Sequence, residues 1–269
     1  MSIPNRKYVI SLSGGLASAA SAIIAHEEGL HYQMVFADTL IEHASLYRFI
    51  GELRNALQRD FVWLVDGRDP WDVFVGENYI GNSRTAHCSD TLKTQQVAAW
   101  MEANAFHSDP LVLGMYKDEE DRLERAQAKW GVQEVTSLLI EYKVTPGDAD
   151  LLVKKYGLER PKLYQLGFPH NNCGGMCVRA GQGQFALLLE TRREFYLEQE
   201  ARNIWAVDSI KASRVSRGLP VDDYLGGFIR VTMGGKLHYL NMRQFRLGVE
   251  SGEIIPARYE MGGCGCFVS

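Results

Sequence analysis

Short apolar runs alternate with segments of helical periodicity along the first half of the chain, and no other feature constrains the fold as strongly. The runs with the length and apolar content of buried strands are residues 8–12, 33–37, 61–65, 111–115 and 134–139. Helical spacing of apolar or charged residues separates them, at residues 17–28, 42–58, 90–103 and 118–129. Because strand–helix–strand units fold as right-handed crossovers, this order predicts an α/β fold with a doubly wound, parallel, five-stranded sheet.

The composition excludes several classes of protein. Of the 269 residues, 46% are apolar and 23% are charged, which is ordinary for a folded globular protein and not for a disordered chain. The net charge of −4 argues against a generally basic nucleic-acid-binding coat. No apolar run approaches the roughly 18 residues that a membrane span needs, and the first residues do not have the pattern of a signal peptide. We therefore expect a cytoplasmic protein with no membrane partner.

The regular alternation of predicted strands and helices ends after residue 145. Residues 166–183 are rich in glycine and carry two cysteines, and residues 226–239 have the pattern of a hairpin. A helix is predicted between them, at about residues 184–204. We expect an α/β domain at residues 1–157 and a smaller, cysteine-containing C-terminal region at residues 158–269 that packs against it.

A turn rich in glycine and serine follows the first predicted strand. Gly14 and Gly15 let a ligand approach the backbone closely, and Ser13 and Ser18 add hydroxyl donors. The N–H groups at the start of the next helix point to the same place, so the segment has the elements of a phosphate-binding loop. Glycines between a strand and a helix are also common in plain tight turns. The segment alone leaves a phosphate site and a plain turn equally open.

Four segments together resemble a known family. Residues 13–18 are similar to the pyrophosphate loop (PP-loop) of N-type ATP pyrophosphatases and phosphoadenosine phosphosulfate reductases. Residues 36–42 are similar to the second-strand signature of that family, residues 114–122 to its fourth-strand segment, and residues 167–177 to the cysteine segment of its reductase-like branch. The resemblance implies the adenine nucleotide alpha hydrolase-like fold, with residues 1–157 as a nucleotide-binding domain. It implies contacts with ATP or another adenine nucleotide, accompanied by Mg²⁺, from Ser13, Gly14, Gly15, Ser18, Asp38, Lys93, Gly114, Glu119 and Arg122.

One position departs from the family pattern. The loop usually carries an acidic residue just before its last serine, and Ala17 stands there. The missing carboxylate argues against full cleavage of ATP and leaves the backbone anion site intact.

Two alternatives also stay open. Asp38 either caps the next helix or contacts the sugar or base of the nucleotide. Glu119 and Arg122 share a helix face and either form a surface ion pair or contact an anion.

Three cysteines suggest a metal centre. The chain has five cysteines and no secretion signal, so metal or redox chemistry is a better expectation than a disulfide framework. Cys173 and Cys177 have a spacing that suits zinc or an iron–sulfur cluster. The resemblance to the reductase-like branch implies a [4Fe-4S] cluster bound by Cys88, Cys173 and Cys177. The assimilatory reductases have two adjacent cysteines where this chain has Cys88 and Ser89, so one iron lacks a thiolate from that set.

The tail offers two further cysteines, Cys264 and Cys266, among glycines. We expect Cys266 as a further metal ligand, and the alternative leaves the iron open to hold a sulfide. A second alternative is a zinc site made by Cys173, Cys177, Cys264 and Cys266. The reductases also carry a catalytic cysteine near the C-terminus, which makes both tail cysteines candidate nucleophiles.

Three functions therefore compete. The first is sulfur transfer, in which ATP adenylates an oxygen of a nucleobase or similar substrate and sulfur replaces that oxygen. The second is reduction of a sulfonucleotide, and the third is a catalytically inactive nucleotide-binding module that regulates a partner. A nucleic-acid substrate is one expected partner, for which the basic residues Lys211, Arg214 and Arg217 are candidate phosphate contacts. A sulfur donor or a thiol-reductant protein is another.

Overall fold

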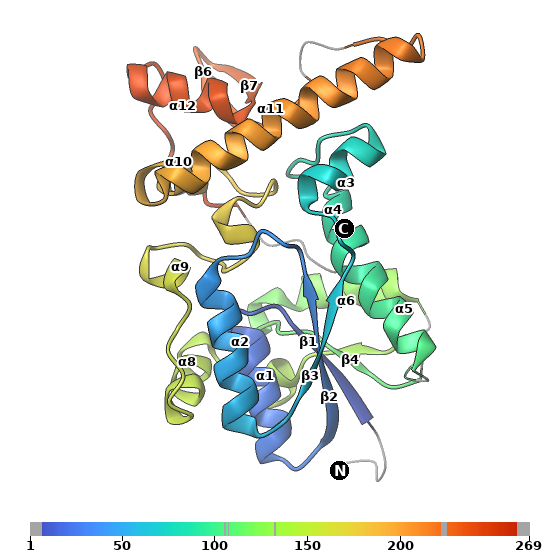
Figure 1. Ribbon diagram of the computed structural model, residues 1–269. Helices are drawn as coiled ribbons and strands as arrows, with labels where there is room; N and C mark the ends of the chain where they lie inside the picture. Colours follow the sequence, from blue (N-terminus) through green and yellow to red (C-terminus); the bar gives the residue numbers. More distant parts are fainter. Residues whose placement is uncertain (1–6, 105, 107, 132, 222–224, 263–269) are drawn as a thin grey trace.

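The computed structural model describes residues 7–104, 106, 108–131, 133–221 and 225–262 (Figure 1). Five parallel strands form the main sheet in the order β3-β2-β1-β4-β5. Their bounds are β1 (Lys7–Leu12), β2 (His31–Asp38), β3 (Phe61–Val65), β4 (Leu111–Val112) and β5 (Val135–Thr136). The prediction of a doubly wound, parallel, five-stranded α/β sheet is confirmed.

Helices cover both faces of this sheet. Side chains alternate along β1, so that Ile10 and Leu12 face one core and Val9 faces the other. The first core is closed by α1 (Leu16–Glu27), α2 (Ala44–Leu57), α7 (Leu138–Glu141) and α8 (Pro146–Lys155). The second is closed by α5 (Gln95–Ala103) and α6 (Glu120–Trp130), which follows the short 3₁₀ helix η2 (Lys117–Glu119). No helix in the described part of the chain is long and apolar enough to cross a membrane.

The two strands after β1 in the sheet are shorter than their apolar runs predict. β4 and β5 have two residues each, whereas the runs extend over 111–115 and 134–139. The chain turns after Leu113, where the amide of Met115 donates to the carbonyl of Leu113 at 3.0 Å. The Ser137 hydroxyl then donates to the Met115 carbonyl at 2.6 Å, and α7 begins directly afterwards. Local turns and a helix therefore take over the second half of each apolar run.

A third core joins the C-terminal half of the chain to one segment of the first half. It contains Trp71 and Phe74 of α3 (Pro70–Glu77) together with residues of the later helices and of the hairpin. The later elements are α9 (Lys162–Gln165), η3 (Cys173–Gly175), α10 (Gln182–Thr191), α11 (Arg193–Ser216), β6 (Ile229–Met233), β7 (Lys236–Leu240) and α12 (Met242–Ser251). β6 and β7 form the predicted hairpin. Division at residues 157 and 158 stays a prediction, and α3 packs into the core of the later part.

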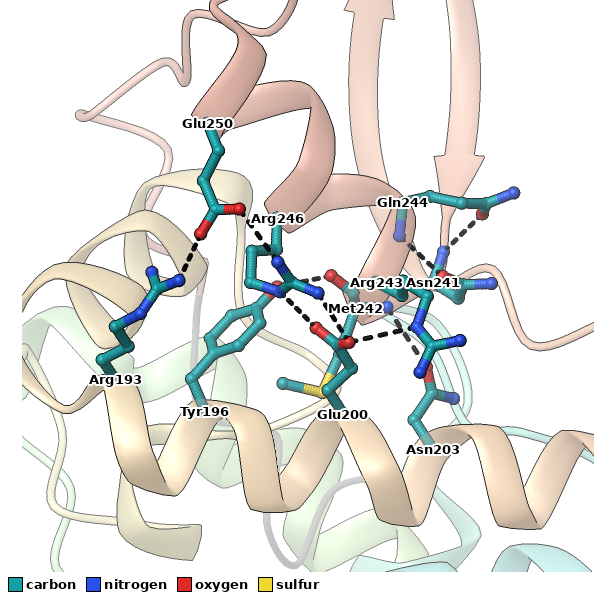
Figure 2. A network of polar contacts seen from close by, with 10 residues as sticks. All are labelled: Arg193, Tyr196, Glu200, Asn203, Asn241, Met242, Arg243, Gln244, Arg246 and Glu250. Atoms are coloured by element: carbon teal, nitrogen blue, oxygen red, sulfur yellow. Dashed lines mark hydrogen bonds and ion pairs between the residues drawn. The ribbon is translucent and has the colours of Figure 1, made fainter.

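Polar contacts fix α12 on α11 (Figure 2). The buried carboxylate of Glu200 accepts hydrogen bonds from Arg246 at 2.7 and 3.0 Å and from Arg243 at 3.2 Å. The Tyr196 hydroxyl donates to the Met242 carbonyl at 2.8 Å. Asn241 caps α12 by accepting from the amide of Gln244 at 2.8 Å. The contacts from Glu200 and Tyr196 join the first two turns of α12 to α11.

Candidate functional site

A cleft of about 630 Å³ lies beyond the carboxyl ends of β1 and β4. Parallel α/β sheets bind ligands at this edge, where the chain leaves adjacent strands in opposite directions. Its lining residues come from four segments that are far apart in the sequence, within residues 11–17, 113–122, 160–164 and 167–172, and Ala37, Lys93 and Pro146 complete the lining. The volume is within the range of small-molecule sites.

The glycine turn forms the floor of this cleft. The Ser18 hydroxyl is buried behind the turn, where it accepts from the Ser13 amide at 3.0 Å and donates to the Gly15 carbonyl at 3.0 Å. The Ser13 hydroxyl lies 3.1 Å from it and accepts from the Gly15 amide at 3.3 Å. Ser13 and Gly15 line the cleft, whereas Gly14 and Ser18 lie behind them. The two serines therefore shape the loop, and Ser13 also faces the open space.

The N-terminus of α1 opens into the cleft. Gly15 is its N-cap, no side chain caps it, and its first turn has no acidic residue. Leu16 and Ala17 of this turn line the cleft. The first N–H groups of a helix have no partner inside the helix and carry a partial positive charge, so a helix N-terminus favours an anion. In this structure the Leu16 amide donates to the Tyr164 hydroxyl at 3.4 Å.

Gly114 lets β4 approach this helix end. A Cβ atom at Gly114 would lie 2.6 Å from the Ser18 nitrogen and 2.7 Å from the Ala17 carbonyl carbon. Both of those atoms belong to the backbone, so a side chain at this position would displace the start of α1. Gly114 also lines the cleft, so it combines a packing role with its place in the wall.

Charged side chains from other segments also line the cleft. The Arg122 guanidinium is 2.6 Å from the Glu119 carboxylate, and both side chains are partly exposed to the cleft. Glu119 also accepts from the Tyr116 amide at 3.1 Å and so caps η2. Lys93 is 5% exposed and its amine is 3.7 Å from a carboxylate oxygen of Glu42. The ion pair that the spacing of Glu119 and Arg122 predicts is present, and it lies inside the cleft.

Asp38 is buried and does not line the cleft. One carboxylate oxygen accepts from the Leu40 amide at 2.9 Å and from the Tyr47 hydroxyl at 2.9 Å, and the other accepts from the Trp63 indole at 3.2 Å. Burial and this carboxylate raise the pKa of Tyr47 far above its ordinary value. In this structure Asp38 therefore holds the turn after β2. Its expected contact with a nucleotide stays a prediction.

Sequence reasoning did not find three side chains that complete the site. The Tyr164 hydroxyl lies 3.4 Å from the Leu16 amide, at the mouth of the anion site. Arg160 lies over the Tyr164 ring, 5.4 Å from its centroid. The side-chain amide of Asn171 donates to the Gly14 carbonyl at 3.1 Å. This hydrogen bond connects the cysteine segment to the glycine loop. All three come from irregular segments or a four-residue helix, which have no periodicity to detect.

The cysteines Cys88, Cys173 and Cys177 line a second, smaller cavity of about 20 Å³. Lys93 lines both this cavity and the large cleft, so the two spaces share one side chain as a wall. The hydrogen bond with Cys177, burial and the nearby Glu42 carboxylate raise the pKa of the Cys173 thiol well above its ordinary value. Cys264 and Cys266 lie outside the described residues, so their predicted roles stay predictions.

The donor atoms around this cavity suit a metal centre, but their arrangement does not. Three soft sulfur donors that face one buried space match the chemistry of an iron–sulfur cluster or of zinc. Within the described ranges, however, no group of three or more His, Cys, Asp or Glu side chains is arranged to hold a metal ion. The donor types therefore fit, and their arrangement is not that of a formed coordination site.

The backbone of the cysteine loop is unusual. Cys173, Gly174 and Gly175 have φ angles of +51°, +58° and +95°, which is the left-handed region. A Cβ atom at Gly174 would lie 2.7 Å from the Ile41 carbonyl oxygen, so glycine is required there. For a residue other than glycine this conformation costs about 1 kcal/mol or more. The packing around the loop holds Cys173 in this conformation, and the residue lines the cavity.

No protein-family model matches the sequence, and no curated protein matches it. Among solved structures, the chain is similar to a phosphoadenylyl-sulfate (PAPS) reductase from Candida auris in a phosphate complex. The identity is 13% and the TM-score 0.46, over 64% of this chain and 82% of the other. It is also similar to an NMN synthetase from Francisella tularensis, with 15% identity and a TM-score of 0.46, over 81% of this chain and 90% of the other. At this level neither likeness carries an argument about function, which depends on the site itself.

Proposed function

We propose that this protein is a PP-loop enzyme that binds ATP or another adenine nucleotide in the large cleft. The observation that carries the proposal is the uncapped N-terminus of α1, which opens with the glycine loop into a cleft of about 630 Å³. Phosphates bind there to backbone N–H groups and to the Ser13 hydroxyl. Arg122, which also lines the cleft, neutralises phosphate charge after leaving Glu119.

Sulfur transfer is the reaction that we propose for this site. A carbonyl-like oxygen of the substrate attacks the α-phosphorus of ATP, and the bond to the bridging oxygen of pyrophosphate breaks. A sulfur nucleophile then displaces AMP together with that oxygen. The helix N-terminus and Arg122 stabilise the charge that develops on the leaving pyrophosphate. Asp118 lines the cleft and is a candidate ligand for Mg²⁺ in place of the acidic residue that Ala17 replaces.

A thiolate-bound metal centre beside the nucleotide belongs to this proposal. Cys88, Cys173 and Cys177 would hold it, and Lys93 on the shared wall would face both the centre and the phosphates. Such a centre, a [4Fe-4S] cluster or the alternative zinc, would bind the sulfur or tune its reactivity. The tail supplies the expected fourth thiolate. A nucleic-acid substrate and a sulfur-donor or thiol-reductant protein remain the proposed partners.

One observation favours a second candidate, a sulfonucleotide reductase. The first turn of α1 has no acidic residue. A reaction that does not release pyrophosphate does not need an acidic residue there. In this reaction a tail cysteine would attack the sulfur of the sulfonucleotide and displace the nucleotide phosphate. The retained anion site serves both candidates, so the choice between them depends on which nucleotide turns over.

Titration calorimetry of anaerobically prepared protein with ATP and with a sulfonucleotide tests the proposal. We expect Arg122→Ala to weaken binding of the preferred nucleotide by about 10- to 100-fold, because a hydrogen bond to a charged group contributes about 1.5–3 kcal/mol. Arg125→Ala is the matched control, since Arg125 is exposed on the same helix and bonds the Asp121 carbonyl. Equal effects of the two substitutions, or no binding of either nucleotide, would contradict the proposed cleft.

A further inference from the structure

A tyrosine from a distant part of the chain covers the first amide of α1. The Tyr164 hydroxyl accepts a hydrogen bond from the Leu16 amide at 3.4 Å, although 148 residues separate the two. The N-cap of this helix is Gly15, which has no side chain that could accept a hydrogen bond from the first turn. The acceptor at this helix end therefore comes from α9, in the later part of the chain.

The Tyr164 hydroxyl also takes up space directly above the glycine loop. A Cβ atom at Gly15 would lie 3.0 Å from the hydroxyl oxygen. Gly15, Leu16 and Tyr164 all line the large cleft. A phosphate bound at this helix end would place an oxygen in the same region, because it needs the same amide protons. The Leu16 amide therefore cannot serve the Tyr164 hydroxyl and a phosphate oxygen at the same time.

A phosphate oxygen is the stronger acceptor of the two. N–H···O distances in proteins are usually close to 2.9–3.0 Å, so the contact of 3.4 Å between Leu16 and Tyr164 is a long one. A phenol hydroxyl is a neutral acceptor, whereas a phosphate oxygen is charged, and charge-assisted hydrogen bonds are about twice as strong as neutral ones. The partial positive charge of the helix end adds to this preference. A phosphate should therefore replace the hydroxyl at the Leu16 amide.

The surroundings of Tyr164 allow its side chain to move while α9 stays in place. Leu163 is fully buried in the third core and anchors the helix, whereas Tyr164 is half-buried. The Arg160 guanidinium lies 5.4 Å from the centroid of the Tyr164 ring, and it also forms an ion pair with Asp150 at 3.3 Å. The ion pair with Asp150 does not depend on Tyr164, so a movement of the ring leaves Arg160 anchored.

We propose that the Tyr164 hydroxyl occupies the place of a phosphate oxygen in the unliganded protein and that nucleotide binding displaces it from the Leu16 amide. Tyr164 then regulates the phosphate site. It satisfies the Leu16 amide while the site is empty, and it lowers the affinity for the nucleotide because this contact must break. The inference rests on the proposed nucleotide site and adds the Leu16 amide to the phosphate contacts of that site.

Tyr164→Phe tests the inference because it removes the oxygen and keeps the ring. The measurement is titration calorimetry of the full chain with ATP and with phosphoadenylyl sulfate. We expect the affinity for the nucleotide that binds to rise about two- to tenfold, since binding no longer breaks a hydrogen bond. The ligand-free variant should melt at the same or a slightly lower temperature, because the Leu16 amide loses its acceptor. A purely structural role of the hydroxyl would not raise the affinity.

Tyr259→Phe is the matched control. It removes the same hydroxyl group from a residue that is 84% exposed and does not line the cleft. We expect this variant to bind nucleotide as the unmodified protein does. An equal rise of affinity in the two variants would show that the position of Tyr164 at the loop is not the cause, and would overturn the inference.

Two further results would overturn the inference and leave the nucleotide site in place. Weaker binding by Tyr164→Phe would show that the hydroxyl contacts the bound nucleotide and is not displaced by it. Unchanged affinity would show that the phosphates do not compete for the Leu16 amide. If the unmodified protein binds neither nucleotide, the proposed site and this inference are both wrong.

Discussion

Gly14 and Gly15 are neighbours in one turn, and each is glycine for a different reason. Gly14 has a φ of +73°, and a Cβ atom there would lie 2.3 Å from the Leu46 Cγ in the core. Gly15 has an ordinary φ of −96°, and its Cβ atom would lie 3.0 Å from the Tyr164 hydroxyl and 3.3 Å from the Ser13 hydroxyl. Gly14 is therefore required for folding, whereas Gly15 is required to keep the space above the loop open.

Substitution of the two glycines by alanine separates these roles. We expect Gly14→Ala to lower the free energy of unfolding by about 1–3 kcal/mol, because it overpacks the core and strains the backbone. Gly15→Ala should change stability little, since Tyr164 can move, and should weaken nucleotide binding about tenfold because a methyl group fills the anion site. Urea unfolding and calorimetry measure the two effects. Nucleotide affinity that survives in Gly15→Ala would place the phosphates elsewhere.

At the scale of elements, one buried carboxylate of α11 meets two arginines of α12. Glu200 is 4% exposed and meets Arg246, whose side chain is also mostly buried, and Arg243 at the edge. The hydrogen bonds from Arg246 hold the pKa of Glu200 below its ordinary value near 4.5, and those from Arg243 act in the same direction. Because the folded-state pKa is lowered, this contribution to stability is complete above the ordinary value and is lost as the pH falls through the folded-state pKa.

Glu200→Gln tests this contact by its dependence on pH. At pH 7 we expect the variant to unfold with about 2 kcal/mol less free energy, which is the typical value of a hydrogen bond to a charged group. The difference should shrink as the pH falls below about 4.5, where the carboxylate of the unmodified protein also becomes neutral. Denaturant unfolding at several pH values measures it. A difference that is independent of pH would show that shape, and not charge, holds α12.

At the scale of the whole molecule, the end of the described chain returns to the cysteine loop. Gly262 pairs with Ala180, and the Gly181 and Gly183 amides donate to the Met261 and Glu260 carbonyls at 3.0 and 2.9 Å. The Ala180 amide in turn donates to the Cys177 carbonyl at 2.8 Å. The last described residues therefore pair with the segment that follows Cys177.

Gly181→Ala tests the path of the tail. A Cβ atom at Gly181 would lie 2.1 Å from the Glu260 carbonyl oxygen, so the segment before the tail must move. We expect this variant and the double variant Cys264→Ser/Cys266→Ser to lose bound metal together, since ligand binding is coupled to local folding. Gly76→Ala in α3 is the control, because nothing lies within 4 Å of its Cβ position. Full metal content in the double variant would show that the tail is not a ligand.

The sequence predicts the sheet well because β1, β2 and β3 are short apolar runs with clear ends. The run at residues 61–65 matches β3 in both bounds. The predicted helix at 90–103 contains a π-helical turn at Asp90–Thr94, which periodicity does not reveal and which brings Lys93 to the wall between the two cavities. Tyr164 and Arg160 were not predicted as site residues, because chain folding, and not a local sequence pattern, brings them to the loop.

The strands on the two sides of the cleft are paired over different numbers of residues. β1 pairs through six residues with β2 but through two with β4, and β4 pairs through two with β5. Amide hydrogens exchange with solvent most slowly where many ladder bonds must open together. Exchange should therefore be slow in β1 and β2 and faster in β4 and β5. The glycine loop follows the strongly paired strand, whereas Arg122 and Glu119 follow the weakly paired one, so the two segments of one cleft are anchored with different local stability.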